Sequence, residues 1–296
     1  MLHKLEMLIA VAKEEHFGRA AASLGITQPT LSTGIRQLEE QLGVQLVFRN
    51  SRYGGLTPEG QSALVWARRI VADARQLKDE MHVKRKGLGG ELRIAVIPTA
   101  LTWAARLTAH FGELHPNVRF TILSRTSIEI LAMIDNLDVD AGISYLDNEP
   151  TGRVITEPLY EERYCLLCSP GSPLAACDSI GWDELAGEKL ALLTPDMQNR
   201  RIINKSLNEA GLVPRVVLES DSPLALVTNV LAGSCVTVLP EDIARCLTTG
   251  TDLALVPLRS STPGHFVGVV APWREPRTPV LEELLSEARR ISEAPR

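Results

Sequence analysis

The chain has 296 residues, of which 45% are apolar, and it carries a net charge of −5. That length allows two or three compact domains, and that apolar content can build their cores. Charged residues interrupt the first ten positions and no apolar run approaches the roughly 20 residues of a membrane span, so the composition argues against an exported or membrane protein. Five cysteines without framework spacing favour a reducing compartment, and we expect a cytoplasmic protein.

Charge is unevenly distributed along the chain. Residues 1–90 hold 13 Lys and Arg against 9 Asp and Glu, whereas the remainder holds 18 against 27. A basic first region and an acidic body suit a protein whose first domain meets phosphates while its body stays away from them.

Three helices are predicted first along the chain. Residues 3–15 form an opening helix with one apolar face, and residues 20–24 form a short helix with small side chains. Gly25 suits a left-handed turn, and Thr27 is a good N-cap for a helix over residues 28–42. A short helix, a glycine turn and a second helix match the spacing of a helix-turn-helix.

The helix over residues 28–42 has two different faces. Its apolar stripe consists of Leu31, Ile35, Leu38 and Leu42. Its other face offers candidate contacts to the DNA major groove, namely Gln28, Pro29, Thr30, Ser32, Thr33 and Arg36. A solvated helix face would look the same, but Arg49 and Arg52 follow in a glycine-containing loop, where a basic wing would meet phosphate or the minor groove.

The whole stretch resembles the N-terminal domain of LysR-type transcriptional regulators. The matching residues are Ala20, Ala21, Leu24, Gln28, Pro29, Ser32, Leu38, Glu39, Leu42, Gly43, Arg49, Leu56, Thr57 and Gly60. The resemblance implies a winged helix-turn-helix that binds double-stranded promoter DNA. We therefore assign residues 1–58 to a DNA-binding domain.

A long helix is predicted from Pro58 to Lys86, about 43 Å at 1.5 Å per residue. Its apolar residues recur at heptad spacing, at Ala63, Ala67, Ile70, Ala74, Leu77 and Met81. Such a helix could pack along one domain or pair with a second copy. The resemblance implies a homodimer through this helix and a homotetramer beyond it. Residues 59–90 are taken as this linker helix and a glycine-rich hinge.

Strands and helices alternate from Glu91 onward, which indicates mostly parallel sheets covered on both faces. We expect two α/β lobes joined by two crossings, near Glu161–Tyr164 and Gly264–Gly268. The predicted fold class is thus α/β: a winged helix-turn-helix, a long dimerisation helix and a two-lobed effector domain like a periplasmic binding protein, over 91–296. Lobe I would take 91–162 and 266–296, and lobe II 163–265.

Ligands of such folds bind where strand ends and helix N-termini face the cleft between lobes. Thr99, Ala100 and Ser127 lie in two such loops, where backbone N–H groups suit a carboxylate, so we expect a small anionic metabolite. Ordinary N-capping is the alternative for these residues. Further candidates across the cleft are Tyr145, Thr194, Met197 and Arg200.

No motif points to an enzyme, a cofactor or a metal. Cys165 and Cys168 are three apart in a predicted strand, so their thiols should point to opposite faces and not share one ion. A ligand-responsive, DNA-binding regulator is the leading hypothesis, with RNA polymerase as a further candidate partner. A constitutive DNA-binding regulator without an effector is the alternative, and an enzyme or a solute-binding protein is the rival from another class.

Overall fold

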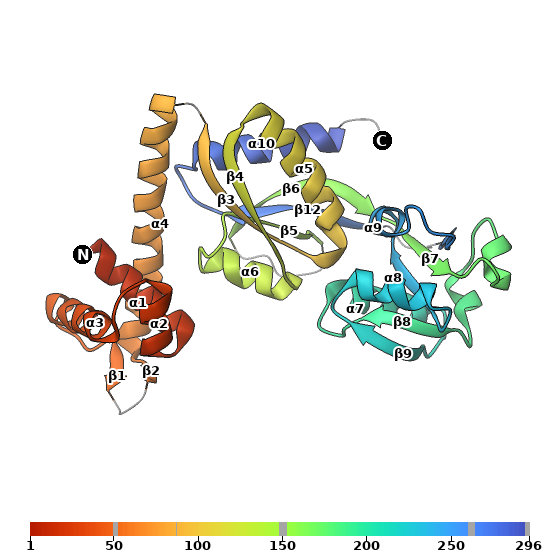
Figure 1. Ribbon diagram of the computed structural model, residues 1–296, viewed down its shortest axis with the longest axis horizontal. Helices are drawn as coiled ribbons and strands as arrows, with labels where there is room; N and C mark the ends of the chain where they lie inside the picture. The colour runs from red at the N-terminus through yellow and green to blue at the C-terminus, as the bar shows by residue number, and fades with distance from the viewer. Residues whose placement is uncertain (50–52, 87, 148–152, 260–263, 294–296) are drawn as a thin grey trace. The chain divides into compact units, whose positions relative to one another are not determined.

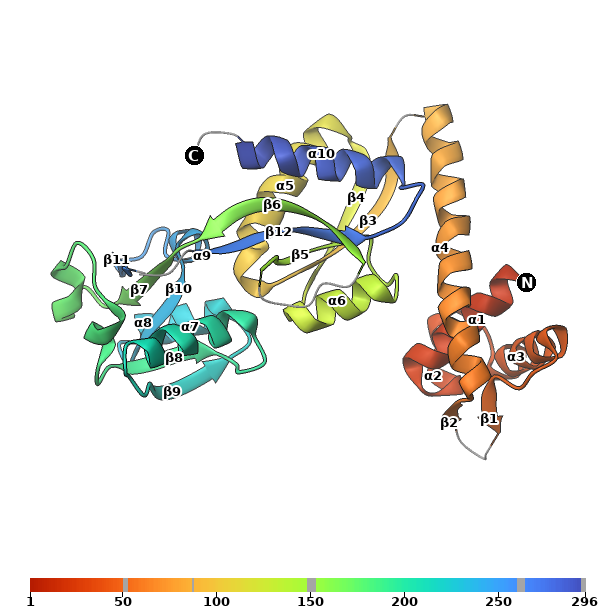
Figure 2. The ribbon, with the colours of Figure 1, turned by 180° about the vertical axis from the view of Figure 1, so that it is seen from behind.

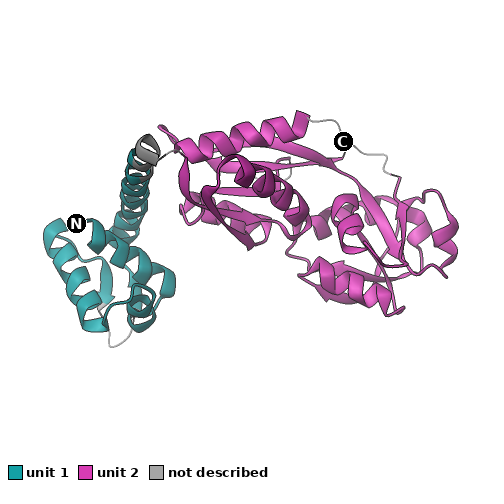
Figure 3. Cartoon of the chain, turned by 45° about the horizontal axis from the view of Figure 1, so that its top comes forward, with its two compact units in different colours: residues 1–87 teal, residues 88–296 magenta. Residues whose placement is uncertain are grey.

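The computed structural model describes residues 1–49, 53–86, 88–147, 153–259 and 264–293, which form two compact units, Met1–Gly87 and Leu88–Arg296 (Figures 1 and 3). Within those ranges, the side chains of residues 49, 53, 79, 80 and 82–86 are not described. No helix in the described ranges is long and apolar enough to cross a membrane.

The first unit is a small helical domain with a two-stranded hairpin. Its elements are α1 (Leu2–Glu14), α2 (Phe17–Ser23), α3 (Gln28–Leu42), β1 (Val47–Arg49), β2 (Tyr53–Leu56) and α4 (Pro58–Lys86). The hairpin forms the predicted wing. Helix α2 begins earlier than expected, because the His16 side chain caps it by accepting hydrogen bonds from the N–H groups of Gly18 and Arg19, at 3.0 and 3.3 Å.

Helix α3 is held by its apolar stripe. Leu31, Ile35 and Leu38 are buried against α1 and α2, whereas Leu42, predicted in the same stripe, is 40% exposed because the helix ends there. Gly25 has φ +66°, the left-handed conformation predicted for the turn before α3.

A buried carboxylate connects α3 to the wing. Glu39 accepts hydrogen bonds from the backbone N–H groups of Leu46 and Val47, at 2.9 and 3.3 Å. Thr57 follows β2 and donates to the Gln45 carbonyl at 2.6 Å. Both ends of the hairpin are therefore fixed to the helical domain.

The second unit contains two five-stranded sheets. The first has the order β4-β3-β5-β12-β6 and consists of β3 (Gly89–Val96), β4 (Asn117–Ser124), β5 (Ala141–Tyr145), β6 (Val154–Glu162) and β12 (His265–Pro272). The second has the order β11-β7-β10-β8-β9 and consists of β7 (Tyr164–Cys168), β8 (Lys189–Leu193), β9 (Arg215–Ser220), β10 (Val236–Pro240) and β11 (Ala254–Pro257).

Helices cover both faces of each sheet, as the alternation predicted. The first lobe carries α5 (Leu101–Leu114) and α10 (Pro279–Glu293) on one face and α6 (Ser127–Asp135) on the other (Figures 1 and 2). The second lobe carries α7 (Gln198–Glu209), α8 (Pro223–Leu231) and α9 (Glu241–Leu247). Single 3-10 turns occur as η1 (Pro98–Ala100), η2 (Pro173–Ala176) and η3 (Trp182–Leu185).

Strand β7 separates two cores in the second lobe. Cys168 packs with residues of α7 and η3, whereas Cys165 packs with residues of α8 and α9. The two thiols therefore point to opposite faces, as expected for residues three apart in a strand.

The chain crosses between the sheets twice. The first crossing passes through Arg163, between β6 and β7, inside the predicted interval. The second was expected near Gly264–Gly268. It lies between β11 and β12, and Gly264 is the last described residue before β12 pairs with β6 from His265 onward.

Strand β6 contains a proline, Pro158. It lies at the sheet edge, where a missing N–H is tolerated, and a bulge at Leu159 adjoins the proline. Helix α9 has only seven residues. Gly89 and Gly90 were assigned to a hinge, yet both pair with β4.

Candidate functional site

The polar face of α3 is mostly exposed. Its side chains are exposed at Gln28, Pro29, Thr30, Thr33 and Arg36, and Ser32 is half-buried. Thr27 caps the helix, and its hydroxyl lies 2.8 Å from that of Thr30. The N-terminal half of the helix thus presents hydroxyl, amide and guanidinium groups outward, as a reading helix requires.

The wing is the second predicted contact surface for DNA. Arg49 is the last residue of β1, but its side chain lies outside the described residues, as does the whole of Arg52. Their contacts with DNA remain predictions from the sequence.

Helix α4 buries one side of its first half. Ala67 and Val71 pack in the core of the first unit, on α1, so the predicted heptad seam is partly used inside one chain. Ile70, between them, is 43% exposed, and farther along Leu77 and Met81 are exposed by 60% and 45%. Val65 and Trp66 are exposed as well. Packing along one domain therefore applies to part of this helix, and pairing with a second copy stays a prediction for its exposed apolar positions.

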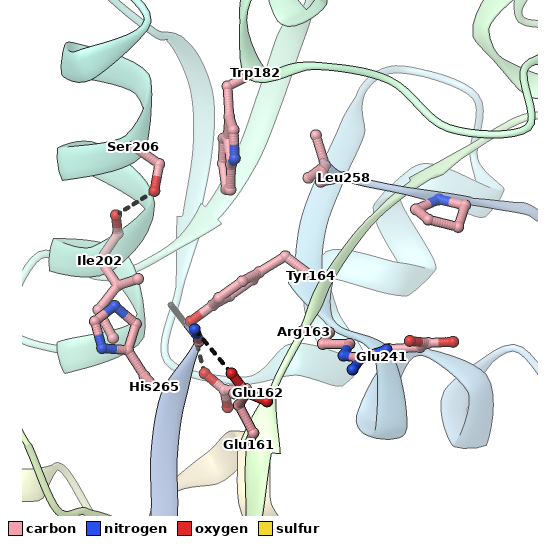
Figure 4. Close-up of a pocket in the computed structure, with 12 residues that line it drawn as sticks. Glu161, Glu162, Arg163, Tyr164, Trp182, Ile202, Ser206, Glu241, Leu258 and His265 are labelled. Atoms are coloured by element: carbon pink, nitrogen blue, oxygen red, sulfur yellow. Dashed lines mark hydrogen bonds between the residues drawn. The ribbon is translucent and has the colours of Figure 1, made fainter. Parts of the chain in front are cut away.

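A cavity of about 530 Å³ lies at the two crossings of the second unit (Figure 4). We call it the hinge pocket. Its lining residues come from both lobes and from the crossing strands: Glu161, Glu162, Arg163, Tyr164, Trp182, Ile202, Ser206, Glu241, Pro257, Leu258, Gly264 and His265.

Glu162 is the most buried polar group of this lining, with 2% of its surface exposed. Its Oε2 accepts hydrogen bonds from the hydroxyls of Tyr145 and Tyr164, at 2.8 and 2.6 Å. Its Oε1 is buried and has no hydrogen-bond partner among the described residues. Burial raises the pKa of Glu162 to about 7, and Asp147 and Asp242 also raise it, while the two tyrosine hydroxyls lower it.

Two further contacts tie the crossing strands together. The backbone N–H of Gly264 donates to Glu161 Oε1 at 3.0 Å, and His265 Nδ1 lies 3.0 Å from Asp147 Oδ2. A Cβ at Gly264 would lie 2.6 Å from Glu161 Cγ and 2.9 Å from the Glu162 carbonyl oxygen, so a glycine lets the strands approach.

A side-chain bridge also joins the lobes beside the hinge pocket. Trp103 on α5 donates from Nε1 to Asp242 Oδ2 on α9 at 2.9 Å. The Trp103 ring stacks on Tyr160, with centroids 4.6 Å apart, and the Arg106 guanidinium lies over its other side, 5.0 Å from the centroid. This arrangement holds the two lobes in one relative position.

The effector candidates from the sequence lie elsewhere. None of Thr99, Ala100, Ser127, Tyr145, Thr194, Met197 and Arg200 is among the twelve lining residues. Tyr145 reaches the hinge pocket indirectly, through Glu162. Thr99 is 1% exposed, and its hydroxyl has no partner in the described part of the chain.

Structural roles occupy one candidate, Arg200, and the neighbour of another, Ser127. Arg200 donates to Glu219 at 2.8 Å, to the Leu193 carbonyl at 2.7 Å and to Asn204 at 3.0 Å. Thr126, just before Ser127, forms a capping box at the start of α6. The capping alternative therefore holds for that loop, and the Arg200 guanidinium is already engaged.

Sequence reasoning did not find Glu162, Tyr164 or Trp182 as site residues. The usable signal was the predicted crossing at Glu161–Tyr164, because a segment that passes between lobes lies at the mouth of any cleft between them. In the described ranges, no group of three or more His, Cys, Asp or Glu side chains gathers as a metal site would require.

Comparison with known proteins covers nearly the whole chain. The family model described as "Bacterial regulatory helix-turn-helix protein, lysR family" matches residues 2–61, and "LysR substrate binding domain" matches residues 85–292. The regulator OxyR of Escherichia coli K12 is 31% identical over 240 residues, 81% of this chain and 78% of OxyR. The regulator YfeR of Shigella flexneri is 29% identical over 86% of this chain and 82% of its own.

Solved structures agree on the fold. A full-length OxyR variant of Pseudomonas aeruginosa matches with a TM-score of 0.76 and 24% identity, over 98% of this chain and 97% of its own. The regulator CbnR, solved in complex with its target DNA, matches with a TM-score of 0.68 and 21% identity, over 98% and 99%.

Proposed function

Because the chain belongs to the LysR family of transcriptional regulators, we propose that its first unit reads a specific operator in duplex DNA and that its second unit adjusts this reading when a small molecule binds. The proposed division is a DNA-binding domain over 1–58, a linker helix over 59–90 and an effector domain over 91–296. RNA polymerase is a further proposed partner.

One observation carries the DNA-binding part of the proposal. The N-terminal half of α3 is exposed and polar, whereas its opposite face is buried in the domain core. We assign major-groove contacts to Gln28, Pro29, Thr30, Ser32, Thr33 and Arg36, and phosphate or minor-groove contacts to Arg49 and Arg52. CbnR, which shares this fold, is solved in complex with its target DNA, which supports DNA binding by the first unit.

The test is a titration of the full chain with duplex DNA that the protein has itself enriched from a random-sequence pool. We expect the logarithm of the binding constant to fall linearly with the logarithm of salt concentration, because phosphate contacts release counterions. Binding that does not discriminate between the enriched duplex and an unselected duplex of equal length would contradict sequence-specific reading.

We propose that α4 pairs two chains. Its exposed apolar side chains at Ile70, Leu77 and Met81 would be covered by a second copy, and two reading helices would then face two half-sites. Pairs of dimers would give the homotetramer. Leu77→Glu should shift the sedimentation of the full chain toward the monomer, whereas Val213→Glu, at a side chain 94% exposed in the second unit, should leave it unchanged. An unaltered oligomer in Leu77→Glu would remove this helix from the interface.

Relatives named as hydrogen peroxide-inducible gene activators raise a second possibility, a redox signal. Thiol oxidation requires an accessible thiolate. Burial raises the pKa of the Cys165 thiol to about 12 and also raises that of Cys168. These two thiols are therefore unsuited to redox sensing, whereas Cys177 and Cys246 are exposed. We favour a bound effector because the second unit contains a pocket. The seven candidates Thr99, Ala100, Ser127, Tyr145, Thr194, Met197 and Arg200 stay proposed contacts of the cleft.

A further inference from the structure

The hinge pocket is acidic. Three of its twelve lining residues are glutamates, and Arg163 is the single permanent cation among the lining side chains that the structure describes. His265 is paired with Asp147 at 3.0 Å. Glu241 is paired with Arg245, whose Nε lies 2.9 Å from Oε1. Glu161 and Glu162 have no cationic partner of this kind among the contacts found in the described residues. The electrostatic field inside the pocket therefore favours a positive charge.

Glu162 contributes a second, independent feature. It is 2% exposed, it lines the pocket, and its Oε1 has no hydrogen-bond partner in the described ranges. Buried polar atoms are nearly always hydrogen-bonded, and a buried carboxylate is costly unless it is paired. A ligand with an N–H donor and a positive charge would meet both needs at this oxygen.

Two of the donors that an anion would need are already engaged. The Tyr164 hydroxyl donates to Glu162 at 2.6 Å, and the Ser206 hydroxyl donates to the Ile202 carbonyl at 3.2 Å (Figure 4). A carboxylate ligand would also face the charges of Glu161 and Glu241. The lining thus disfavours the anionic metabolite that the loops before the helices led us to expect.

The remaining wall is apolar and partly aromatic. Trp182 and Tyr164 lie edge to face with ring centroids 6.1 Å apart, and Ile202, Pro257 and Leu258 complete this side. Aromatic faces attract cations and also pack against flat apolar groups. The wall can therefore hold the body of a small ligand while the glutamates hold its charged end.

We propose that the hinge pocket binds an organic cation, with its ammonium or amidinium group at Glu162 and Glu161 and a flat apolar body against Trp182. This inference rests on the proposed function, since it names the class of the effector. The charged end of the ligand would lie at the first crossing and its body on the second lobe. The ligand would therefore contact both sides of the crossing between the lobes.

The experiment uses the full chain in calorimetric titrations with matched ligand pairs at pH 8, where Glu162 is ionised. Tryptamine, phenethylamine and benzamidine are each compared with a carboxylate of similar body: indole-3-acetate, 3-phenylpropionate and benzoate. We expect at least one cation to bind at millimolar concentration or below, on the order of tenfold or more tightly than its carboxylate, because a charge-assisted hydrogen bond is lost and a repulsion added in the latter.

Variants locate the binding. Glu162→Gln keeps an oxygen for both tyrosine hydroxyls but removes the charge, and Glu161→Gln does the same for the contact with Gly264. Each variant should lower the affinity for the cation on the order of tenfold. Glu113→Gln, at an exposed position on α5, should leave that affinity unchanged. A folded Glu161→Gln keeps the test valid if Glu162→Gln unfolds.

Three results would overturn the proposal: no cation binds at millimolar concentration, the carboxylates bind more tightly, or neither glutamine variant weakens the cation. Binding of the enriched duplex is measured on the same samples. If the protein binds the enriched duplex but one of these three results appears, the proposed ligand class is wrong and the proposed DNA binding is unaffected. If the duplex is not held, the proposed function itself fails.

Discussion

The exposed face of α3 and the wall of the hinge pocket use polar side chains in opposite ways. On α3, Thr33 and Arg36 point away from the domain and contribute nothing to its core. In the pocket, Glu162 is buried and held by two tyrosine hydroxyls. Substitutions on α3 should therefore change DNA affinity and leave stability alone, whereas substitutions at Glu162 should change ligand binding and stability together.

The largest expected effect tests this coupling through pH. The pKa of Glu162 is raised from its ordinary value of 4.5 to about 7, so the folded chain holds a proton there that the unfolded chain releases. The free energy of unfolding of the wild type, measured relative to that of Glu162→Gln, is thus highest below pH 4.5. This difference falls as pH rises through 7. Two and a half pKa units correspond to about 3 kcal/mol.

Urea denaturation of the wild type and Glu162→Gln at pH 5 and pH 8 measures this difference. The other ionisable groups that face Glu162, namely Tyr145, Asp147, Tyr164, Asp242 and the nearby His265, are present in both chains and cancel to first order. We expect the free energy of unfolding of Glu162→Gln to rise relative to that of the wild type when the pH is raised from 5 to 8. A difference that is equal at pH 5 and pH 8 would show that Glu162 titrates normally.

The next effect belongs to α3. Arg36→Ala should weaken binding of the enriched duplex by roughly 1–3 kcal/mol, the discrimination expected of a guanidinium bidentate to guanine. Arg215→Ala, exposed at the edge strand β9 of the second unit, is the matched control. Equal affinities of Arg36→Ala and wild type in a gel-shift titration would remove Arg36 from the reading surface.

A smaller effect is expected at the bridge between the lobes. Asp242→Ala removes the acceptor of the Trp103 indole N–H and should lower the free energy of unfolding by about 1 kcal/mol. Asp178→Ala, at an exposed loop position, serves as the control. Identical urea midpoints for the two variants would mean that the bridge does not stabilise the second unit.

The smallest expected effect on stability is that of Thr33→Ala. Thr33→Ala should leave the free energy of unfolding within about 0.5 kcal/mol of wild type, because the side chain is exposed. Its affinity for the enriched duplex should nevertheless fall. A loss of stability instead would mean that Thr33 supports the fold, and the comparison between the two regions would break down at this residue.

Local patterns predicted the first unit well because its signals lie within single helices. The spacing of Leu31, Ile35 and Leu38 defines the buried side of α3 and, by exclusion, its exposed side. Leu42 was wrongly predicted to be buried. Periodicity does not show that the last residue of a helix can lack a neighbouring element to pack against.

The hinge pocket could not be predicted in this way. Its lining joins segments more than one hundred positions apart, as in the contact between Glu161 and Gly264, and no local pattern reports such contacts. The strand that leads to Glu162 contains Pro158, and a proline fits a strand at a sheet edge, a position that depends on long-range pairing. Arg200, on α7, looked available in the sequence, but its partner Glu219 comes from strand β9.

Glu39 has a consequence for how the first unit meets DNA. One buried carboxylate links the end of α3 to the first residues of the wing, at Leu46 and Val47. The angle between helix and hairpin is therefore set when the domain folds, before any operator arrives. The entropy of orienting these two elements is lost during folding rather than during association, so the pre-organised pair can give more of its contact energy to affinity.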